Sequence, residues 1–135
     1  MSELPSRPLP KLDDSNREFW TGGAAGELRI MKCQDCNHFI HPPTPVCSHC
    51  LSENVAAEAV AGTGVVDTFT VNYQQWHPAM KPPYVIARVA VDGAPGVILT
   101  TNIVGCDVDD VDIGDPVKVT FEQCDDVYLP LFEKV

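Results

Sequence analysis

Two Cys-x-x-Cys pairs constrain the fold of this chain more than any other feature. Cys33 and Cys36 form the first pair, Cys47 and Cys50 form the second, and ten residues separate the pairs. The two sulfur atoms of one such turn can face a single ion, and two turns complete a tetrahedral site of four thiolates. Asn37 follows the first pair, where a left-handed backbone is common and Asn tolerates it. The spacing predicts a zinc ribbon with these four cysteines as ligands.

A site of four thiolates is closed. Catalytic zinc keeps an open coordination position for water or substrate, whereas four cysteines fill the tetrahedron. We therefore expect a structural metal, because the roughly 25 residues around the pairs are too few to fold without one. His38, His41 and His49 are then interpreted as loop residues. Iron in a rubredoxin-like site would use the same ligands, so zinc and iron both remain open at this point.

The rest of the chain is typical of a small β-barrel. A short strand is predicted over residues 27–32, leading into the first cysteine pair. Four or five further strands follow without a long helix between them, and Val117, Val119 and Phe121 alternate on one face of one of them. The last strand is expected at a sheet edge, where Pro130 is tolerable. The predicted strands after the ribbon span residues 64–73, 84–91, 96–104, 117–122 and 127–132. This pattern favours a five-stranded OB-fold barrel.

The N-terminal region is predicted to be an arm followed by a short helix. Residues 1–12 are rich in proline, which indicates a flexible or draped arm. The stretch 15–18 (SNRE) fits a capping box, and the helix it starts would carry Phe19 and Trp20. These aromatic side chains could pack on the domain or dock a partner. The overall prediction is a mainly β chain with an arm and helix (1–26), a rubredoxin-like zinc ribbon (27–58) and an OB-fold domain (59–135).

Charge and composition restrict the partners. The formal net charge is -10, with only nine Lys and Arg residues. Such a surface repels phosphate backbones, so nucleic acid and anionic membranes are disfavoured. No apolar run approaches the roughly 20 residues of a membrane-spanning helix, and the first 14 residues lack the apolar core of a secretory signal. We therefore expect a cytoplasmic protein, whose paired cysteines bind metal and do not form disulfides.

The remaining chemical groups suggest no catalytic centre. Cys106 and Cys124 are isolated and are expected to be buried apolar side chains. The aspartates between residues 107 and 115 miss the spacing of a calcium loop and indicate a solvated loop. His77 has no Ser, Cys or Asp partner beside it. It lies in the connection 72–83, which either covers the barrel rim or has a functional role. No catalytic residue is predicted.

An ordered set of motifs extends from about residue 13 to the end of the chain. In order, the motifs are Phe19-Trp20, GELRIMKCQDC, Pro42-Pro43, the second Cys-x-x-Cys, Gly62-Thr63-Gly64 before Phe69-Thr70-Val71, Pro83-Tyr84, Ile113-Gly114 with Pro116-Val117, and Leu129-Pro130. Together they resemble the zinc-ribbon plus OB-fold family catalogued as domain of unknown function thirty-five. Many members have an aromatic residue before the Pro-Pro pair and Arg after it, where this chain has His41 and Thr44.

The resemblance implies a role beside an enzyme. Members of this family are typically complexed with thiolase-fold enzymes that act on acyl-CoA. By this resemblance the helix and ribbon contact the partner, and a passage between ribbon and barrel accepts the pantetheine arm of CoA. The cofactors implied are structural zinc and a CoA thioester shared within a hetero-oligomer. The predicted partner or CoA contacts are Phe19, Trp20, Pro42, Pro43 and Trp76.

Three functional hypotheses follow. The first is a non-catalytic accessory subunit of a thiolase-fold acyl-CoA-processing complex, whose enzyme is a thiolase, synthase or aldolase. The alternative is a nucleic-acid-binding zinc-ribbon OB-fold protein, which would need a basic groove with stacking aromatic side chains. The third is a free-standing acyl-CoA enzyme, for which the sequence offers no catalytic residues.

Overall fold

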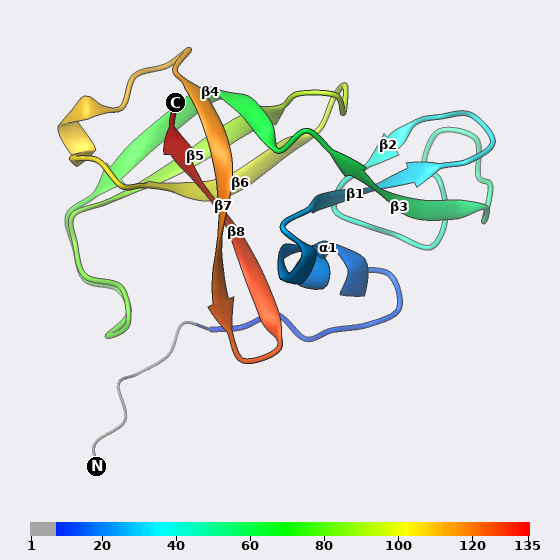
Figure 1. Cartoon of the computed structure of the whole chain (residues 1–135), viewed down its shortest axis with the longest axis horizontal. Helices are drawn as coiled ribbons and strands as arrows, with labels where there is room; N and C mark the ends of the chain where they lie inside the picture. The colour runs from blue at the N-terminus through cyan, green and yellow to red at the C-terminus, as the bar shows by residue number, and fades with distance from the viewer. Residues whose placement is uncertain (1–7) are drawn as a thin grey trace.

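The computed structural model describes residues 8–135, so residues 1–7 of the predicted arm lie outside the described residues. The chain forms a short helix, a three-stranded ribbon sheet and a closed barrel (Figure 1). No helix in the described part of the chain has the length and apolar character needed to cross a membrane. The elements before the barrel are α1 (Arg17–Thr21), the 3-10 turn η1 (Gly22–Ala25), β1 (Leu28–Cys33), β2 (Phe39–Ile40) and β3 (Val55–Val60). Those of the barrel region are β4 (Thr63–Asn72), β5 (Tyr84–Val91), β6 (Ile98–Val104), the 3-10 turn η2 (Val108–Asp110), β7 (Pro116–Cys124) and β8 (Val127–Lys134).

The ribbon sheet has the order β2-β1-β3, and both pairings are antiparallel. β2 is very short and pairs with β1 only at Met31–Ile40 and Lys32–Phe39. β3 pairs along the whole of β1. Its sequence, VAAEAV, is too rich in Ala to indicate a strand by itself, and the sequence analysis did not identify it. Pairing with β1 therefore determines that this segment is a strand.

The barrel closes in the order β4-β5-β6-β8-β7, with β7 paired back to β4. A β-bulge between Val66 and Thr68 lies in β4, the longest strand. All neighbours are antiparallel except β6 and β8, which run parallel. The predicted fold class, a zinc ribbon region followed by a five-stranded OB-type barrel, is confirmed.

The position predicted for the last strand was wrong. β8 is not an edge strand, because it pairs with β7 along its whole length and with β6 at Phe132 and Glu133. Pro130 lies two residues before the contact with β6. At Pro130, β8 therefore has a paired strand on one side only, which is β7. Its missing N–H group therefore does not prevent closure of the barrel.

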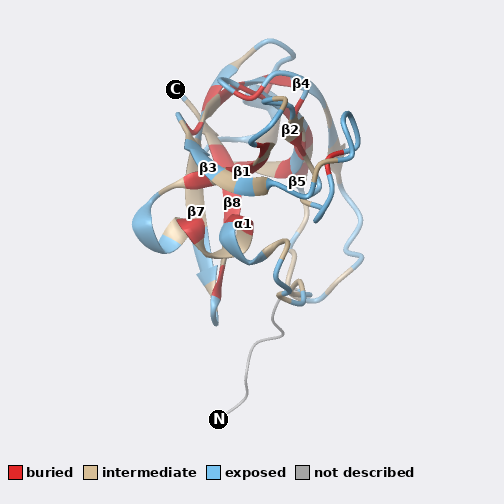
Figure 2. Cartoon of the chain, turned by 90° about the vertical axis from the view of Figure 1, so that its right-hand side faces the viewer, coloured by how far each residue is buried: buried red, intermediate tan, exposed pale blue. Residues whose placement is uncertain are grey.

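One apolar core joins the barrel to the ribbon (Figure 2). Phe132 lies at the centre of the barrel with no exposed surface. Phe19 from α1 and both Leu28 and Ile30 from β1 belong to the same cluster. A second cluster surrounds the cysteines, and a third lies under the β7–β8 hairpin, where Trp20 packs with leucines of the N-terminal segment. The ribbon and the barrel are thus held by shared side chains.

The start of α1 differs from the predicted capping box. The N-cap residue is Asn16, which makes no capping bond with its side chain. The Oδ1 atom of Asp13 accepts hydrogen bonds from the backbone N–H groups of Ser15 and Asn16, both at 2.8 Å. Glu18 instead pairs with Arg29 of β1 at 2.6 Å. Asp13 thus accepts the hydrogen bond from the Ser15 N–H group, and Arg29 binds the Glu18 carboxylate, so the two halves of the predicted capping box have other partners.

The link between ribbon and barrel is short and tightly held. Only Ala61 and Gly62 separate β3 from β4. The carbonyl oxygen of Gly62 accepts a hydrogen bond of 2.6 Å from the backbone N–H of Val119 in β7. Gly62 has a φ of +79°, and a Cβ atom there would lie 2.8 Å from Cγ1 of Val119. Only glycine fits this link without strain.

Gly23 provides a test of how α1 and η1 pack on the hairpin. A Cβ atom at Gly23 would lie 2.4 Å from the Cβ of Tyr128 and 2.7 Å from Cδ1 of Phe121. We expect Gly23→Ala to lower the free energy of unfolding by about 1–3 kcal/mol, because the turn must move off the hairpin. Urea denaturation measures this change. Ala24→Ser, at an exposed site in the same turn, is the control and should stay within about 0.5 kcal/mol of the wild type. Equal stability of wild type and Gly23→Ala would contradict the packing.

Candidate metal centre and adjoining cavity

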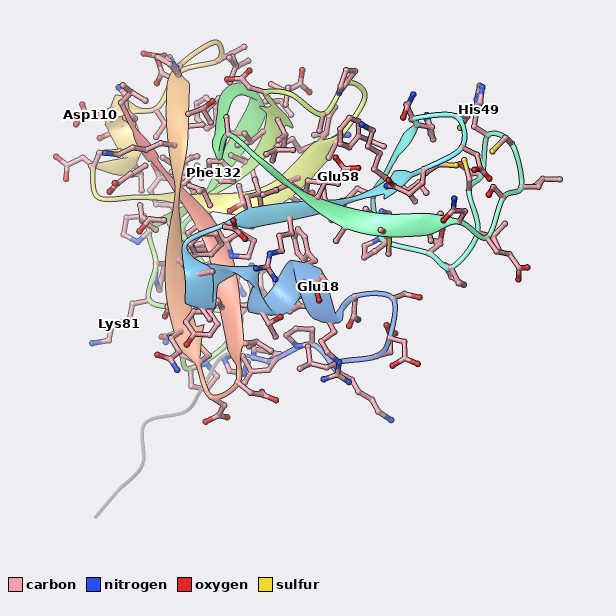
Figure 3. All side chains as sticks on the ribbon, turned by 45° about the vertical axis from the view of Figure 1, so that its right-hand side comes forward. Glu18, His49, Glu58, Lys81, Asp110 and Phe132 are labelled. Atoms are coloured by element: carbon pink, nitrogen blue, oxygen red, sulfur yellow. The ribbon has the colours of Figure 1, made fainter. Side chains whose placement is uncertain are left out.

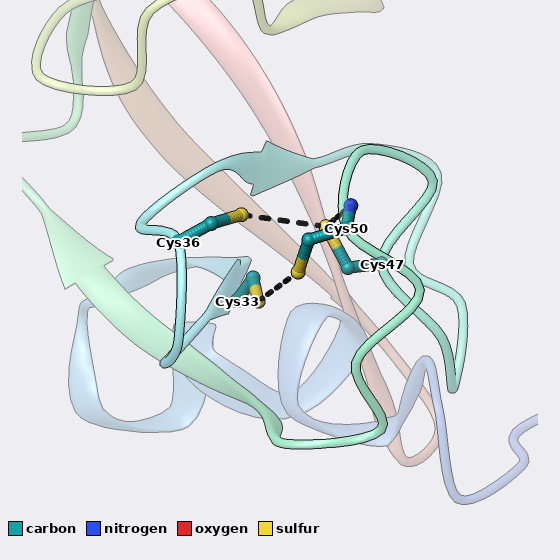
Figure 4. A group of neighbouring side chains, drawn as sticks. All are labelled: Cys33, Cys36, Cys47 and Cys50. Carbon is teal, nitrogen blue, oxygen red and sulfur yellow. Dashed lines mark hydrogen bonds between the residues drawn. The ribbon is translucent and has the colours of Figure 1, made fainter.

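The four paired cysteines meet at the end of the ribbon farthest from the barrel (Figures 3 and 4). All four are free thiols, and their Sγ atoms lie within 4.8 Å of one another. The Sγ–Sγ distance is 3.6 Å between Cys33 and Cys50 and 3.7 Å between Cys36 and Cys47. A tetrahedral site with metal–sulfur bonds of 2.3 Å has sulfur–sulfur edges of about 3.8 Å. The donor set therefore fits a four-thiolate zinc site.

The two cysteine turns have the same backbone geometry. Asn37 has the predicted positive φ, 64°, and its N–H group donates to the carbonyl of Cys33 at 2.9 Å. Leu51 occupies the equivalent place after the second pair, with a φ of 65° and the same bond to Cys47 at 2.9 Å. Leucine rarely adopts this conformation, so the residue type at position 51 did not indicate a left-handed residue after the second pair. The spacing of the cysteines was the only available signal.

Backbone N–H groups, burial and the neighbouring thiols together shift the pKa values of the cysteine thiols. The N–H groups of Cys36 and Asp35 lower the pKa of the Cys33 thiol to about 7, against the effect of burial. For Cys50, the N–H of Ser52 lowers the pKa, but desolvation and the neighbouring thiols outweigh it and raise the pKa to about 12. The metal-free cluster therefore retains protons at neutral pH. Binding of a metal must release them.

A polar network joins the two cysteine turns. The carboxylate of Asp35 accepts hydrogen bonds from the hydroxyl of Ser52 and from Nδ2 of Asn54, the latter at 3.1 Å. These two bonds lower the pKa of Asp35. The backbone N–H of Gln34 also donates to the carbonyl of Asn54 at 2.8 Å. The network supports the cluster from outside, and the sequence analysis did not identify it.

The three histidines of the ribbon lie in two places. The rings of His38 and His49 stack with centroids 5.2 Å apart. His41, Pro42 and Pro43 follow β2 and form what we call the ribbon tip. There the partly buried ring of His41 contacts that of Phe19 at a centroid distance of 5.0 Å. His41 is therefore more than the plain loop residue expected from the sequence, because it joins the ribbon tip to α1.

A cavity of about 480 Å³ opens between the ribbon tip and the barrel. Its walls come from the segment before α1, from α1 itself, from the ribbon tip and from β6 and β8. Phe19, Trp20, Pro42 and Pro43, four of the five predicted contact residues, line this cavity. The other described lining residues are Pro10, Lys11, Asp13, Asn16, His41, Leu99, Thr100, Thr101, Asn102, Leu129, Pro130 and Leu131. Whether any of the four binds a partner or CoA remains a prediction.

Trp76, the fifth predicted contact, lies elsewhere. It is 71% exposed in the loop between β4 and β5, and its Nε1 donates to Oδ1 of Asn72 at 3.1 Å. Met80 of the same loop lines a second hollow of about 250 Å³. This hollow shares residues 100–102 of β6 with the larger cavity. The loop that carries Trp76 therefore borders the same stretch of the barrel.

The other groups considered in the sequence form no site. The prediction that Cys106 is buried was wrong, because it is exposed in the turn after β6, whereas Cys124 is partly buried at the end of β7. Nδ1 of His77 accepts a local hydrogen bond from the N–H of Ala79 at 3.1 Å. In the acidic loop, Asp115 pairs with Lys134 at 3.4 Å. Among residues 8–135, the four paired cysteines are the only group of three or more potential metal ligands.

Comparisons with known proteins agree with this architecture. A family model described as "ChsH2, rubredoxin-like zinc ribbon domain" matches residues 20–56, and one described as "ChsH2, C-terminal OB-fold domain" matches residues 57–122. A "DUF35 domain-containing scaffold protein" of Methanothermobacter thermautotrophicus is 30% identical over 94 residues, which cover 68% of this chain and 69% of that protein. The chain belongs to the DUF35 family. The resemblance found in the sequence is confirmed.

Two further relatives of this chain are named after acyl-CoA enzymes. A "Probable enoyl-CoA hydratase alpha subunit" of Thermomonospora curvata is 35% identical over 127 residues, covering 93% of this chain and 39% of the relative. The "3-oxo-4,17-pregnadiene-20-carboxyl-CoA hydratase alpha subunit" of Mycobacterium tuberculosis is 34% identical over 103 residues, covering 76% of this chain and 32% of the relative. The chain thus spans less than half the length of these two relatives.

Two solved structures have the same fold. A chain of the "Ltp2-ChsH2(DUF35) aldolase" matches with a TM-score of 0.84 and 32% identity, over 93% of this chain and 98% of that chain. A DUF35 protein of Sulfolobus solfataricus matches with a TM-score of 0.65 and 18% identity, over 90% of this chain and 86% of the other. The second likeness supports the fold alone. The first covers nearly all of both chains.

Proposed function

We propose that this chain is a non-catalytic accessory subunit of an acyl-CoA-processing complex. Membership of the DUF35 family supports this role, since relatives of this family are named as a scaffold protein, as subunits of CoA-ester hydratases and as part of an aldolase. The partner we propose is a thiolase-fold enzyme that provides the catalytic residues. The cavity wall formed by the described residues contains neither Cys nor Ser, so a nucleophile of either type would have to come from the partner.

The observation that carries the proposal is the cavity at the ribbon tip. Its volume of about 480 Å³ lies within the range typical of small-molecule sites. Among the described residues, aromatic, proline and leucine side chains make up most of its wall, and Lys11 is the only Lys or Arg. A narrow, uncharged pantetheine arm fits such a wall better than the phosphates of CoA do. We therefore infer that this chain binds the arm and that the partner binds the nucleotide.

The metal has an indirect part in this function. We propose that Cys33, Cys36, Cys47 and Cys50 hold a structural zinc ion. His41, Pro42 and Pro43 lie between the two cysteine pairs, and all three line the cavity. Zinc would therefore fix one wall of the ligand site without touching the ligand. The exposed Trp76 loop is proposed as a further contact with the partner.

Reconstitution tests the proposed role. The zinc-loaded chain is coexpressed with each thiolase-fold enzyme of its source organism, and native mass spectrometry identifies the assemblies that form. We expect a hetero-oligomer that turns over an acyl-CoA ester, and no turnover by this chain alone. A monomer with every candidate enzyme across a range of salt concentrations would refute the proposal, and so would turnover by the isolated chain. Submicromolar binding of single-stranded RNA or DNA would favour the alternative function.

Filling the cavity from its outer wall should block ligand binding. Thr100 is an exposed residue of β6 that lines the cavity, so the barrel can accept a larger side chain there. We expect Thr100→Trp to weaken binding of a CoA thioester by about tenfold or more, because the indole occupies the space of the arm. Calorimetric titration of the complex measures this. Thr70→Trp, on an exposed site of β4 outside the cavity, is the control. If both variants lost affinity equally, or if neither lost affinity, the cavity would not be the ligand site.

A further inference from the structure

One buried side-chain polar atom in the described part of the chain has no hydrogen-bond partner, and it belongs to a residue of the cavity wall. This atom is Nδ1 of His41. His41 and Phe19 both line the cavity, and the centroids of their rings are 5.0 Å apart. A buried polar atom without a partner is unfavourable, so such atoms in folded proteins usually have a partner or a role. A ligand in the cavity would provide the missing partner.

Three other neutral polar side chains of the wall, those of Thr101, Asn102 and Asn16, already have partners within the protein. The hydroxyl of Thr101 donates to the carbonyl of Pro130 at 2.8 Å. Nδ2 of Asn102 donates to the carbonyl of Val85 at 2.8 Å. Asn16 accepts from the N–H of Asp13 at 2.8 Å and donates to the carbonyl of Lys11 at 3.1 Å. These bonds hold the wall together. His41 is thus the wall residue with a buried group left for a ligand.

The state of the imidazole indicates which ligand group it would bind. Burial lowers the pKa of His41, so the ring is neutral at neutral pH and has one donor and one acceptor nitrogen. Buried N–H groups without a partner are rarer than buried acceptors without one. The favoured tautomer therefore carries its proton on Nε2 and leaves a lone pair on Nδ1. The ligand must then offer a donor, and a small rotation about the soft ring torsion would direct Nδ1 to it.

We propose that His41 binds an amide N–H of the ligand arm and makes the cavity selective for amide-containing chains. The inference rests on the proposed function, because the pantetheine arm of a CoA thioester contains two amide groups. An acyl chain of the same width offers no N–H group and would leave Nδ1 without a partner. His41 then distinguishes the arm from other apolar chains that fit the same space. Pro42, Pro43 and Phe19 provide the apolar contacts on either side.

A pair of matched ligands tests this role. The probes are S-acetylpantetheine and an analogue in which an ester oxygen replaces each amide N–H group. Both are titrated into the full zinc-loaded chain and into its complex. We expect the wild type to bind the amide ligand up to about tenfold more tightly than the ester, the effect of one hydrogen bond. His41→Phe, which keeps the ring but removes both nitrogens, should reduce this ratio to about one.

Further variants make the outcome decisive. His41→Gln retains an acceptor and should keep part of the preference for the amide. His38→Phe changes a histidine of the same ribbon that does not line the cavity, and its ratio should equal that of the wild type. An unchanged ratio in His41→Phe would overturn the role of His41 and leave the proposed function intact. If the wild type and its complex bind neither probe, the proposed CoA site itself is overturned, and the role of His41 with it.

Discussion

Replacement of Cys33 by Ser is expected to release the metal and unfold the ribbon. Cys33 is fully buried at the end of β1, and its Sγ lies 3.6 Å from that of Cys50. A serine hydroxyl is a poor zinc ligand, so the variant loses most of an apparent binding free energy of about 10–16 kcal/mol. The cluster around the cysteines contains few apolar side chains besides Met31 and Ile40. It therefore cannot hold the two turns together without the metal.

Metal analysis and amide hydrogen exchange measure this effect. Zinc should fall from about one ion per chain to background after dialysis, and protection should be lost in β1, β2 and β3. Cys106→Ser is the matched control, because Cys106 is an exposed thiol outside the cluster and should leave zinc content unchanged. Full zinc content and a native melting curve in Cys33→Ser would show that the proposed ligand set is wrong. Iron found in place of zinc would identify the other metal that the same ligands accept.

Replacement of Phe132 by Ala should destabilise the barrel more than any other single truncation of the core. Phe132 has no exposed surface and is the largest fully buried side chain among the described residues. Phe132, labelled in Figure 3, pairs with Val119 of β7 and with Ile103 of β6, where the parallel contact closes the barrel. Loss of its ring leaves a cavity at this closure. We expect the free energy of unfolding to fall by about 3–5 kcal/mol.

Urea denaturation followed by tryptophan fluorescence and by circular dichroism gives this value. Agreement of the two signals would establish a single transition, which the comparison of free energies requires. Trp76→Ala, followed by circular dichroism, is the control, because it removes a larger ring from an exposed loop and should cost less than about 0.5 kcal/mol. A loss below about 1 kcal/mol in Phe132→Ala would mean that the barrel core does not depend on this ring.

Local signals in the sequence predicted much of the fold. The spacing of the cysteines predicted the cluster, and Asn37 indicated the left-handed residue of the first turn. Runs of β-branched, aromatic and apolar residues located the barrel strands, with clear alternation in residues 117–122. The domain boundaries and the contacts of Trp76 remain predictions. These signals share one property, because each depends on residues close together in the chain.

The features that the sequence missed depend on contacts between distant residues. The Ala-rich β3 is a strand because β1 lies beside it, and β8 is central because it reaches β6. Glu18 does not form the predicted capping box because its carboxylate binds Arg29, eleven residues away. His41 belongs to the cavity wall because α1 and the barrel meet at the ribbon tip. No pattern of neighbouring residues could indicate these arrangements.

The tight link at Gly62 has a consequence for the width of the cavity. Because the backbone passes from β3 to β4 through two residues, and Val119 holds the second of them, ribbon and barrel have no free hinge between them. The distance from the tip at Pro42 and Pro43 to the walls of β6 and β8 is then set by the backbone. In the proposed function, the cavity would therefore have a fixed width, and it would select ligand chains by their thickness. A larger residue at position 62 would clash with Val119 and would therefore shift the ribbon relative to the barrel.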